Sequence, residues 1–335
     1  MKNRSFAIYI TIGLLLLITA VWTLRTPPSK PFDAAQDKPQ VDSVITASAV
    51  PATEPPPFPS ETPTAEAVLT PFDGQRAHAD VETQVAFGAR SPGTDGHAKI
   101  REWMRAELEA AGWQVEAQES ETLGHPVVNL IAKRGDEPPQ IIAGAHYDSR
   151  MFADHDPDPA KQMEPVPAAN DGASGVAVLL GLARSLPADT TPIWLVFFDA
   201  EDNGRIEGWE WILGSREFVK NNPAVRPDAV VIVDMIGDAD LNIFKERNSN
   251  AVLTEEIWTV AKELGYENKF IPEYKHSILD DHMPFLEAGI PAVDIIDFDY
   301  PYYHTLADTP DKVSAESLQA VGDTLYTWII RQHGQ

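Results

Sequence analysis

The chain has 335 residues, enough for one large domain or two small ones, and its apolar content of 43% is typical of a globular protein. The 51 aspartates and glutamates outnumber the 26 lysines and arginines, which gives a net charge of -25. Such a surface repels phosphate backbones, so the charge argues against nucleic acid as a partner. The chain has no cysteine, so any bound metal must be held by His, Asp and Glu.

Residues 1–25 have the pattern of a membrane anchor or a signal segment. Lys2 and Arg4 precede an apolar run over residues 6–24. A helix of about 20 apolar residues can cross a bilayer, and basic residues before it favour a cytoplasmic N-terminus. A cleavable signal peptide is the alternative, although no clear small-x-small site precedes Arg25. Either interpretation predicts an extracytoplasmic protein, anchored to the membrane by this helix or secreted.

Residues 26–71 differ sharply in composition from the rest of the chain. Prolines, including Pro55-Pro56-Pro57, alternate here with Thr, Ser, Ala and Glu. A segment of this composition cannot bury enough apolar surface to form a core, so we expect a disordered linker. The catalytic domain is then expected over residues 72–335.

Helical and strand patterns alternate within residues 72–335. Apolar spacing predicts helices, and short apolar runs predict strands. The expected helices are 97–111, 174–186, a short one around Glu217, 254–264 and 314–330; the expected strands are 127–132, 141–145, 193–198, 229–233 and 292–296. This alternation predicts an α/β fold, a three-layer sandwich in which helices flank a mixed, largely parallel central sheet. Ligands bind outside the carboxyl ends of the strands in such sheets.

Five polar clusters follow an apolar strand or open a helix. They occupy residues 144–149, 169–175, 197–202, 233–237 and 302–305. Each residue alone has a structural explanation: Asp171 can cap a helix, and His304 can bond to backbone. Together, two histidines and several carboxylates at one sheet edge concentrate negative charge that a divalent cation relieves. Imidazole and carboxylate ligands without thiolates suit a zinc site with an open position.

The order of these clusters resembles the zinc aminopeptidases of the bacterial leucyl aminopeptidase type and the glutaminyl cyclases that share their fold. The similarity covers about residues 80–332 and runs through His-Tyr-Asp-Ser, Asn-Asp-Gly-Ala-Ser-Gly, Glu-Asp, Val-Asp-Met-Ile-Gly and Tyr-His-Thr. The resemblance implies that zinc binds to Asp171, Asp202 and His304. In the two-metal peptidases, His146 and Asp234 would complete a second site in which Asp171 bridges. We therefore expect one zinc ion in a cyclase and two in a peptidase.

Three further segments are more similar to cyclases than to peptidases: 211–216, 279–282 and 289–297. The cyclase resemblance implies that Glu201 is the general acid and base, in a carboxylate network with Asp234 and Asp280. It also implies that Tyr303, where cyclases commonly have Trp, flanks the substrate glutamine. Asp202 stands where the peptidases usually have Glu, and Asp is also a competent ligand.

Trp209 and Trp211 follow the pair Glu201-Asp202 in the chain. Both rings can line the substrate pocket or pack in the core, and Trp209 is retained as a candidate substrate contact. Structural, hydrogen-bonded roles are expected for His276 and His282.

The expected function is that of a glutaminyl-peptide cyclotransferase, an aminoacyltransferase that acts on peptide or protein N-termini. It would convert N-terminal glutamine to pyroglutamate and release ammonia. Two alternatives use the same fold: a metallo-aminopeptidase that hydrolyses N-terminal residues, and a non-catalytic binding module. Metal stoichiometry and turnover discriminate among the three.

Overall fold

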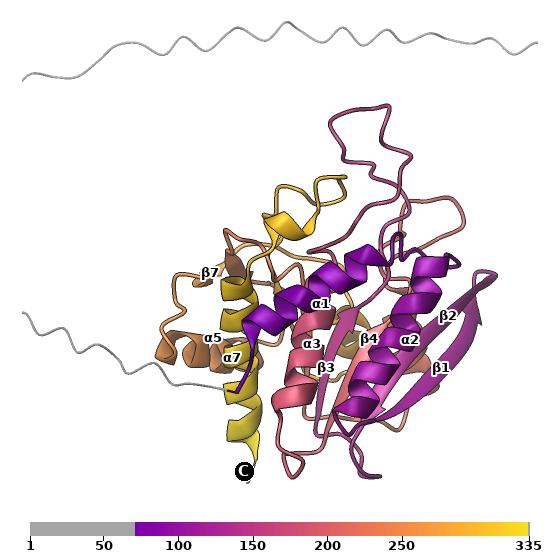
Figure 1. The fold of residues 1–335 in the computed structure, drawn as a ribbon. Helices are drawn as coiled ribbons and strands as arrows, with labels where there is room; N and C mark the ends of the chain where they lie inside the picture. Colours follow the sequence, from indigo (N-terminus) through magenta and orange to yellow (C-terminus); the bar gives the residue numbers. More distant parts are fainter. Residues whose placement is uncertain (1–70, 334–335) are drawn as a thin grey trace, which may run out of the picture. The chain divides into compact units, whose positions relative to one another are not determined.

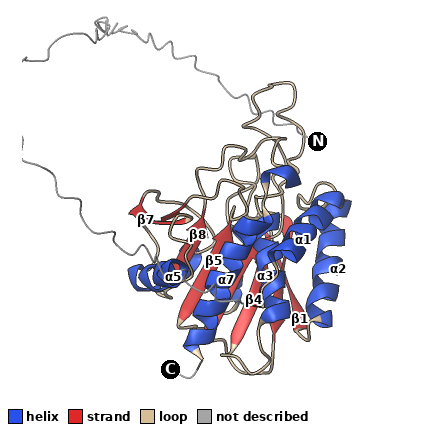
Figure 2. Cartoon of the chain, turned by 60° about the vertical axis from the view of Figure 1, so that its left-hand side comes forward, coloured by secondary structure: helices blue, strands red, loops and turns tan. Residues whose placement is uncertain are grey.

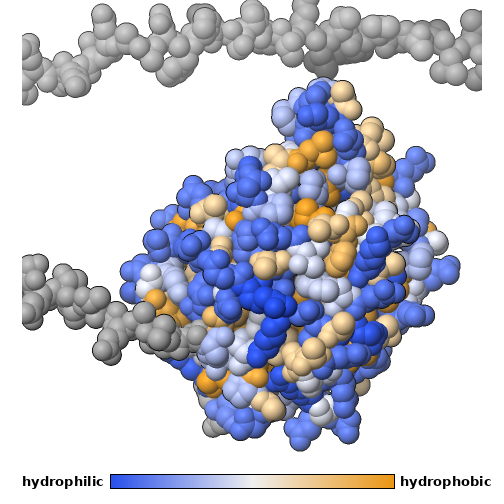
Figure 3. Space-filling view, in the orientation of Figure 1, coloured by the Kyte–Doolittle hydropathy of each residue, from blue (hydrophilic) through white to orange (hydrophobic). Residues whose placement is uncertain are grey.

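The computed structural model describes residues 71–333, and no helix among them is long and apolar enough to cross a membrane. The predicted anchor lies outside these described residues, as does all of the predicted linker except Pro71. Figure 1 follows the described part from α1 (Gly74–Ala86) to α7 (Ala315–Gln332). Hydrophilic residues predominate on the face drawn in Figure 3, with hydrophobic ones in small groups.

A six-stranded mixed sheet forms the centre of the domain. Its order is β1-β2-β4-β3-β5-β8, and the strands are β1 (Gln114–Thr122), β2 (His125–Lys133), β3 (Ile141–His146), β4 (Ile193–Phe198), β5 (Ala229–Asp234) and β8 (Ala292–Ile296). Strands β4, β3, β5 and β8 are parallel, whereas β2 is antiparallel to both β1 and β4. The predicted fold, with its mixed and largely parallel sheet, is confirmed. A separate parallel pair joins β6 (Ile243–Lys245) to β7 (Phe270–Tyr274).

Helices cover both faces of the sheet and make it the middle of three layers. Figure 2 shows the face on which α1 and α7 lie. The larger core packs α1, α2 (Asp95–Ala110), α3 (Ala173–Ser185), α5 (Ala251–Glu263) and α7 against one face. The smaller core packs α4 (Leu213–Asn221) and α6 (Met283–Glu287) against the other, through Phe218 and Phe285. Ile142 and Ala143 are neighbours in β3 yet belong to different cores, because side chains alternate between the faces of a strand.

Helix α3 lies at the centre of the larger core, with all residues from Ala173 to Ala183 buried. Gly175 lets the helix approach β5 closely, because a Cβ atom there would lie 2.4 Å from the carbonyl oxygen of Val233. The Phe72 ring lies between Gly181 of α3 and Gly322 of α7, where a Cβ on either glycine would be within 2.4 Å of it. These contacts fix the first described residues onto the core.

Candidate metal centre

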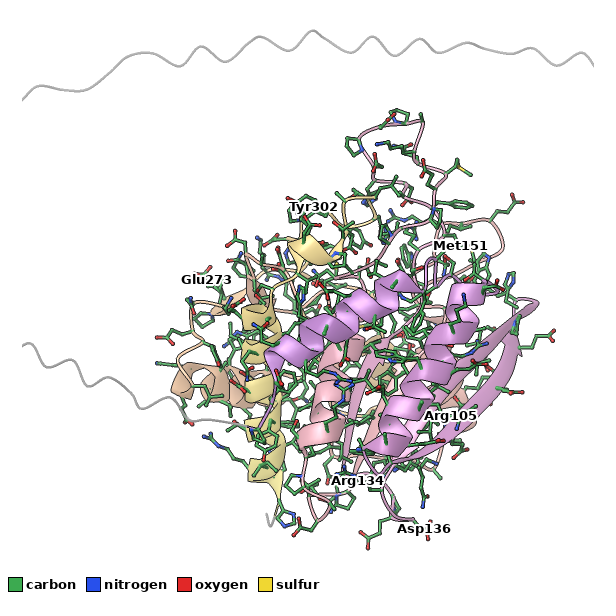
Figure 4. All side chains as sticks on the ribbon, in the orientation of Figure 1. Arg105, Arg134, Asp136, Met151, Glu273 and Tyr302 are labelled. Carbon is green, nitrogen blue, oxygen red and sulfur yellow. The ribbon has the colours of Figure 1, made fainter. Side chains whose placement is uncertain are left out.

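The candidate residues come together at the carboxyl ends of the parallel strands. His146 and Asp234 are the last residues of β3 and β5, Glu201 and Asp202 follow β4, and Asp171 precedes α3. His304 lies in the loop after β8. Figure 4 shows Met151, in the loop after β3, and Tyr302, two residues before His304, at this same end of the domain.

Two buried groups of three side chains share Asp171. In the first, His146 Nε2 lies 3.1 Å from Asp171 Oδ1 and 3.2 Å from Asp234 Oδ1. In the second, His304 Nε2 lies 2.8 Å from Asp202 Oδ1 and 3.6 Å from Asp171 Oδ2. The five ligand candidates therefore lie as the resemblance implies, close enough together for one cation or for two that share Asp171.

The electrostatics of these groups suit a bound cation. Burial raises the pKa of Asp202 to about 6 and that of Asp234 to about 7, and the charge of Asp171 adds to both shifts. The buried oxygens Asp171 Oδ2 and Asp202 Oδ2 accept no hydrogen bond. A divalent cation would displace the protons and satisfy the oxygens, so this donor set fits zinc.

Glu201 is buried beside this centre but belongs to neither group of three. Burial raises the pKa of Glu201 well above its ordinary value, and the negative charges of Asp202, Asp280 and Asp281 add to the effect, against the opposing charge of His146. A carboxyl group with a raised pKa can exchange a proton near neutral pH, as a general acid and base must.

A cavity of about 410 Å³ opens onto the centre. Glu201, Asp234 and Asp280, which the cyclase resemblance places in one carboxylate network, all line it. Its other lining residues are Arg150, Asp154, His155, Asp171, Asp202, Arg205, Trp211, Met235, Ser277, Ile278, Leu279, Ile296, Phe298, Tyr303 and His304.

Two aromatic rings in this cavity lie against the candidate ligand His304. The ring of Tyr303 stacks on His304 at a centroid distance of 3.5 Å, and Trp211 stacks at 6.0 Å. The prediction for Trp209 is corrected: its ring lies outside the cavity and stacks on His125 at 3.7 Å. Trp211 packs against Gly204, where a Cβ atom would be 2.2 Å from the ring.

Three more residues, which the sequence analysis did not single out, order the site from behind. Asp148 accepts hydrogen bonds from the backbone N–H groups of Glu201 at 3.0 Å and Asp202 at 3.3 Å. Asp308 accepts from the N–H of Asp171 at 3.2 Å. Arg150 donates to the carbonyl oxygen of Asp202 at 3.0 Å. Asp148 lies within the polar cluster of residues 144–149, whereas Asp308 and Arg150 give no signal in a single sequence.

The comparisons with known proteins agree with this geometry. Residues 129–329 match the model of peptidase family M28, and the chain belongs to that family. Aminopeptidase YwaD of Bacillus subtilis is 30% identical over 203 residues, which are 56% of this chain and 39% of that protein. The glutaminyl-peptide cyclotransferase of Bothrops jararaca is 25% identical over 72% of this chain and 77% of that protein.

Solved structures show the same two activities among similar proteins. A Zn-dependent exopeptidase from Parabacteroides distasonis has a TM-score of 0.73 and 33% identity, over 79% of this chain and 99% of that one. The glutaminyl cyclase of Tannerella forsythia has a TM-score of 0.73 and 35% identity, over 78% of this chain and 99% of that one. The family and its similar structures imply zinc, and they support an enzyme of the zinc aminopeptidase superfamily.

Proposed function

We propose that the chain is a glutaminyl-peptide cyclotransferase, which converts the N-terminal glutamine of peptides to pyroglutamate and releases ammonia. The observation that carries the proposal is the set of three carboxyl groups, Glu201, Asp234 and Asp280, around one cavity beside the candidate metal centre. Similarity to the Tannerella forsythia cyclase supports it.

Asp171, Asp202 and His304 would hold the zinc ion of a cyclase. Bound there, zinc supplies a Lewis acid for the γ-carboxamide oxygen of the substrate glutamine. The ring of Tyr303, stacked on His304, would flank the glutamine and limit its freedom. Because the reacting amine and carbonyl belong to the same residue, holding them in a near-attack geometry is a large part of the task.

Glu201 would move the proton. The α-amine attacks the carbonyl carbon of the γ-carboxamide, a C–N bond forms, and the bond from that carbon to the amide nitrogen breaks. Glu201 accepts the proton from the attacking amine and delivers it to the departing ammonia. Asp234 and Asp280 lie in the same cavity, and the charge of Asp280 helps to keep the pKa of Glu201 high enough for both transfers.

The test is to incubate the full-length protein with one peptide that begins with Gln and one that begins with Leu, and to follow both by mass spectrometry. A cyclase removes the mass of one ammonia from the Gln peptide and leaves the Leu peptide intact. No change in the Gln peptide, from a protein loaded with zinc, would reject the proposal.

A metallo-aminopeptidase is the second candidate, and one observation favours it. His146 and Asp234 form a complete second group with Asp171, as a two-metal peptidase requires. In that case Glu201 would activate a water molecule, and the Leu peptide would become shorter by one residue. Two zinc ions per chain would support the peptidase, and one would support the cyclase.

For the rest of the chain we propose that residues 1–25 form a membrane anchor or signal segment and residues 26–71 a linker. The catalytic domain would then lie outside the cytoplasm. The apolar run over residues 6–24 and the prolines after it support this proposal. Recovery of the intact chain in the cytosolic fraction of its own cells would contradict it.

A further inference from the structure

One wall of the cavity has no regular secondary structure. It consists of residues 275–280, here called the wall segment, and four of these residues line the cavity: Ser277, Ile278, Leu279 and Asp280. Asp280 is the carboxyl group that the proposed function places with Glu201. Whatever fixes the wall segment therefore helps to fix Asp280, whose carbonyl oxygen also accepts from the N–H of Met283 at 2.8 Å.

The wall segment is tied to the β6 loop, residues 245–249. The N–H of Lys275 donates to the carbonyl oxygen of Lys245 at 3.1 Å. Asn248 Nδ2 donates to the carbonyl oxygen of Ile278 at 3.2 Å. These bonds join the wall segment to the last residue of β6 and to the loop after it, about thirty residues away in the chain, so the wall depends on the β6 loop for its conformation.

The buried side chain of Glu246 stands at the centre of this junction, and it is only 1% exposed. Its Oε1 accepts from the N–H of Ile278 at 2.9 Å. Its Oε2 accepts from the N–H groups of Asn248 at 2.8 Å and Ser249 at 2.7 Å, and lies 3.4 Å from Nε2 of His282. Burial alone would raise the pKa of Glu246, but these donors, His282 foremost, lower it to about 2.

We propose that Glu246 is a positioning residue, which fixes the wall segment and so holds Asp280 in place beside Glu201. The inference rests on the proposed function and concerns how the same site is kept in order. Every group that faces the Glu246 carboxylate can be a donor, and the three backbone N–H groups among them all find an acceptor in it. In Glu246→Gln, the amide oxygen would keep the more numerous donors on the Oε2 side, so the new NH₂ group would face the N–H of Ile278, which would lose its acceptor.

The test is a double-mutant cycle in the full-length protein with a Gln-initiated peptide. Displacement of a catalytic group by about 1 Å costs on the order of 100-fold in rate, so Glu246→Gln should lower kcat by about 10- to 100-fold. If Glu246 acts through Asp280, adding Glu246→Gln to Asp280→Asn should lower kcat by a further factor of less than about three. Losses that multiply in the double variant would overturn the proposal.

Glu255→Gln is the matched control. Glu255 pairs with Lys245 of the β6 loop at 2.6 Å, its side chain is 60% exposed, and it makes no contact with the wall segment. This variant should keep wild-type kcat. Imidazole serves as a probe of the metal, because its binding would need only the zinc ion. It should inhibit the wild type and Glu246→Gln equally. Weaker inhibition of the variant would mean general damage to the site and would overturn a positioning role.

Hydrogen exchange separates this inference from the proposed function. The amide of Ile278 should exchange faster in Glu246→Gln than in the wild type, whatever reaction the protein catalyses. If the wild type does not cyclise glutamine, the proposed function fails while the exchange still tests the junction. Unchanged exchange at Ile278 in Glu246→Gln would overturn the role of Glu246. If the wild type is a cyclase, an unchanged kcat in Glu246→Gln would overturn it too.

Discussion

Three residues at or next to the candidate ligands and Glu201 have a left-handed backbone without being glycine. His304 has a φ of 57°, Ala200 of 52° and Met235 of 47°. Side chains disfavour this conformation by about 1 kcal/mol or more, so the surrounding structure must hold each of them there. Each lies at or next to a residue of the site: His304 is itself a candidate ligand, Ala200 precedes Glu201, and Met235 follows Asp234. The geometry of the site is thus set by backbone conformation as well as by side chains.

At the same scale, the proposed proton carrier can be tested by Glu201→Gln. The amide cannot accept a proton, so turnover should fall by about 100- to 10,000-fold. Zinc content should not change, because Glu201 belongs to neither ligand group. Activity and metal content are measured on the same preparation, and near-wild-type turnover would show that another group is the base.

Gly172 leaves room for the ring of the candidate ligand His146 beside Asp171 and Asp234. A Cβ atom on Gly172 would be 2.3 Å from His146 Nε2. Gly172→Ala should therefore push the ring away from Asp171 and Asp234 and weaken zinc binding by about 10- to 100-fold, as outer-sphere changes do. Titration with a zinc indicator measures this. Equal unfolding midpoints of wild type and variant in excess chelator are the control that the fold is intact.

Individual residues differ in how far a single sequence can place them. The convergence of Asp171, Asp202 and His304 could be predicted because their motifs are specific and occur in order. The prediction that Trp209 contacts the substrate is wrong, and it is Trp211 that lines the cavity. The loop that holds both indoles has no periodicity that shows which ring faces the cavity. Glu246 was missed for a similar reason, since an isolated Glu in an acidic chain is normally solvated.

At the scale of elements, strand ends position the site and loops complete it. The buried parallel strands were predicted well, with 193–198 and 292–296 confirmed to the residue, because continuous apolar runs mark strands covered on both faces. Helix α1, the edge strand β1 and the pair β6–β7 were not predicted. β1 alternates between exposed and partly buried residues, most of them polar, so it lacks an apolar signal. Pairing with β2, rather than local sequence, makes it a strand.

The junction between the β6 loop and the wall segment should depend on pH in a defined direction. The folded pKa of Glu246, about 2, is below the ordinary value of a glutamate side chain, about 4.3. The stabilisation is therefore complete above about pH 5 and is lost as pH falls toward 2. The difference in unfolding free energy between wild type and Glu246→Gln should shrink by about 1 kcal/mol between pH 6 and pH 3.5. Denaturant unfolding of both proteins in chelator measures it, and a constant or growing difference would contradict the ionised state of Glu246.

At the scale of the whole molecule, the five candidate ligands come from segments between residues 146 and 304. Within the described domain, both groups of three form only when β3, β5, the loop after β4 and the loop after β8 are all in place. The family could be inferred from sequence because the motifs occur in the order in which these segments assemble. The choice between one ion and two could not, since the same side chains serve both.

Metal binding and global stability should therefore be linked. Ligands that bind only the folded state stabilise it by about 4 kcal/mol when present at a thousand times Kd. Removal of zinc by a chelator should lower Tm by about 10 °C for a domain of this size. Asp171→Asn, which alters the residue that both groups share, should remove most of this response. Differential scanning calorimetry measures both, and a Tm that ignores the chelator would contradict a zinc ion held at this centre.

The seating of Phe72 determines how the domain meets mechanical load. A pull on the chain ahead of residue 72 would reach first the ring that lies between α3 and α7, and the nearby hydrogen bond from Gln319 Nε2 to the carbonyl oxygen of Phe72. The strands of the sheet begin only at residue 114. We expect tension at this end of the domain to act on the Phe72 ring and on α1 before it disturbs the strand ends that carry the candidate ligands.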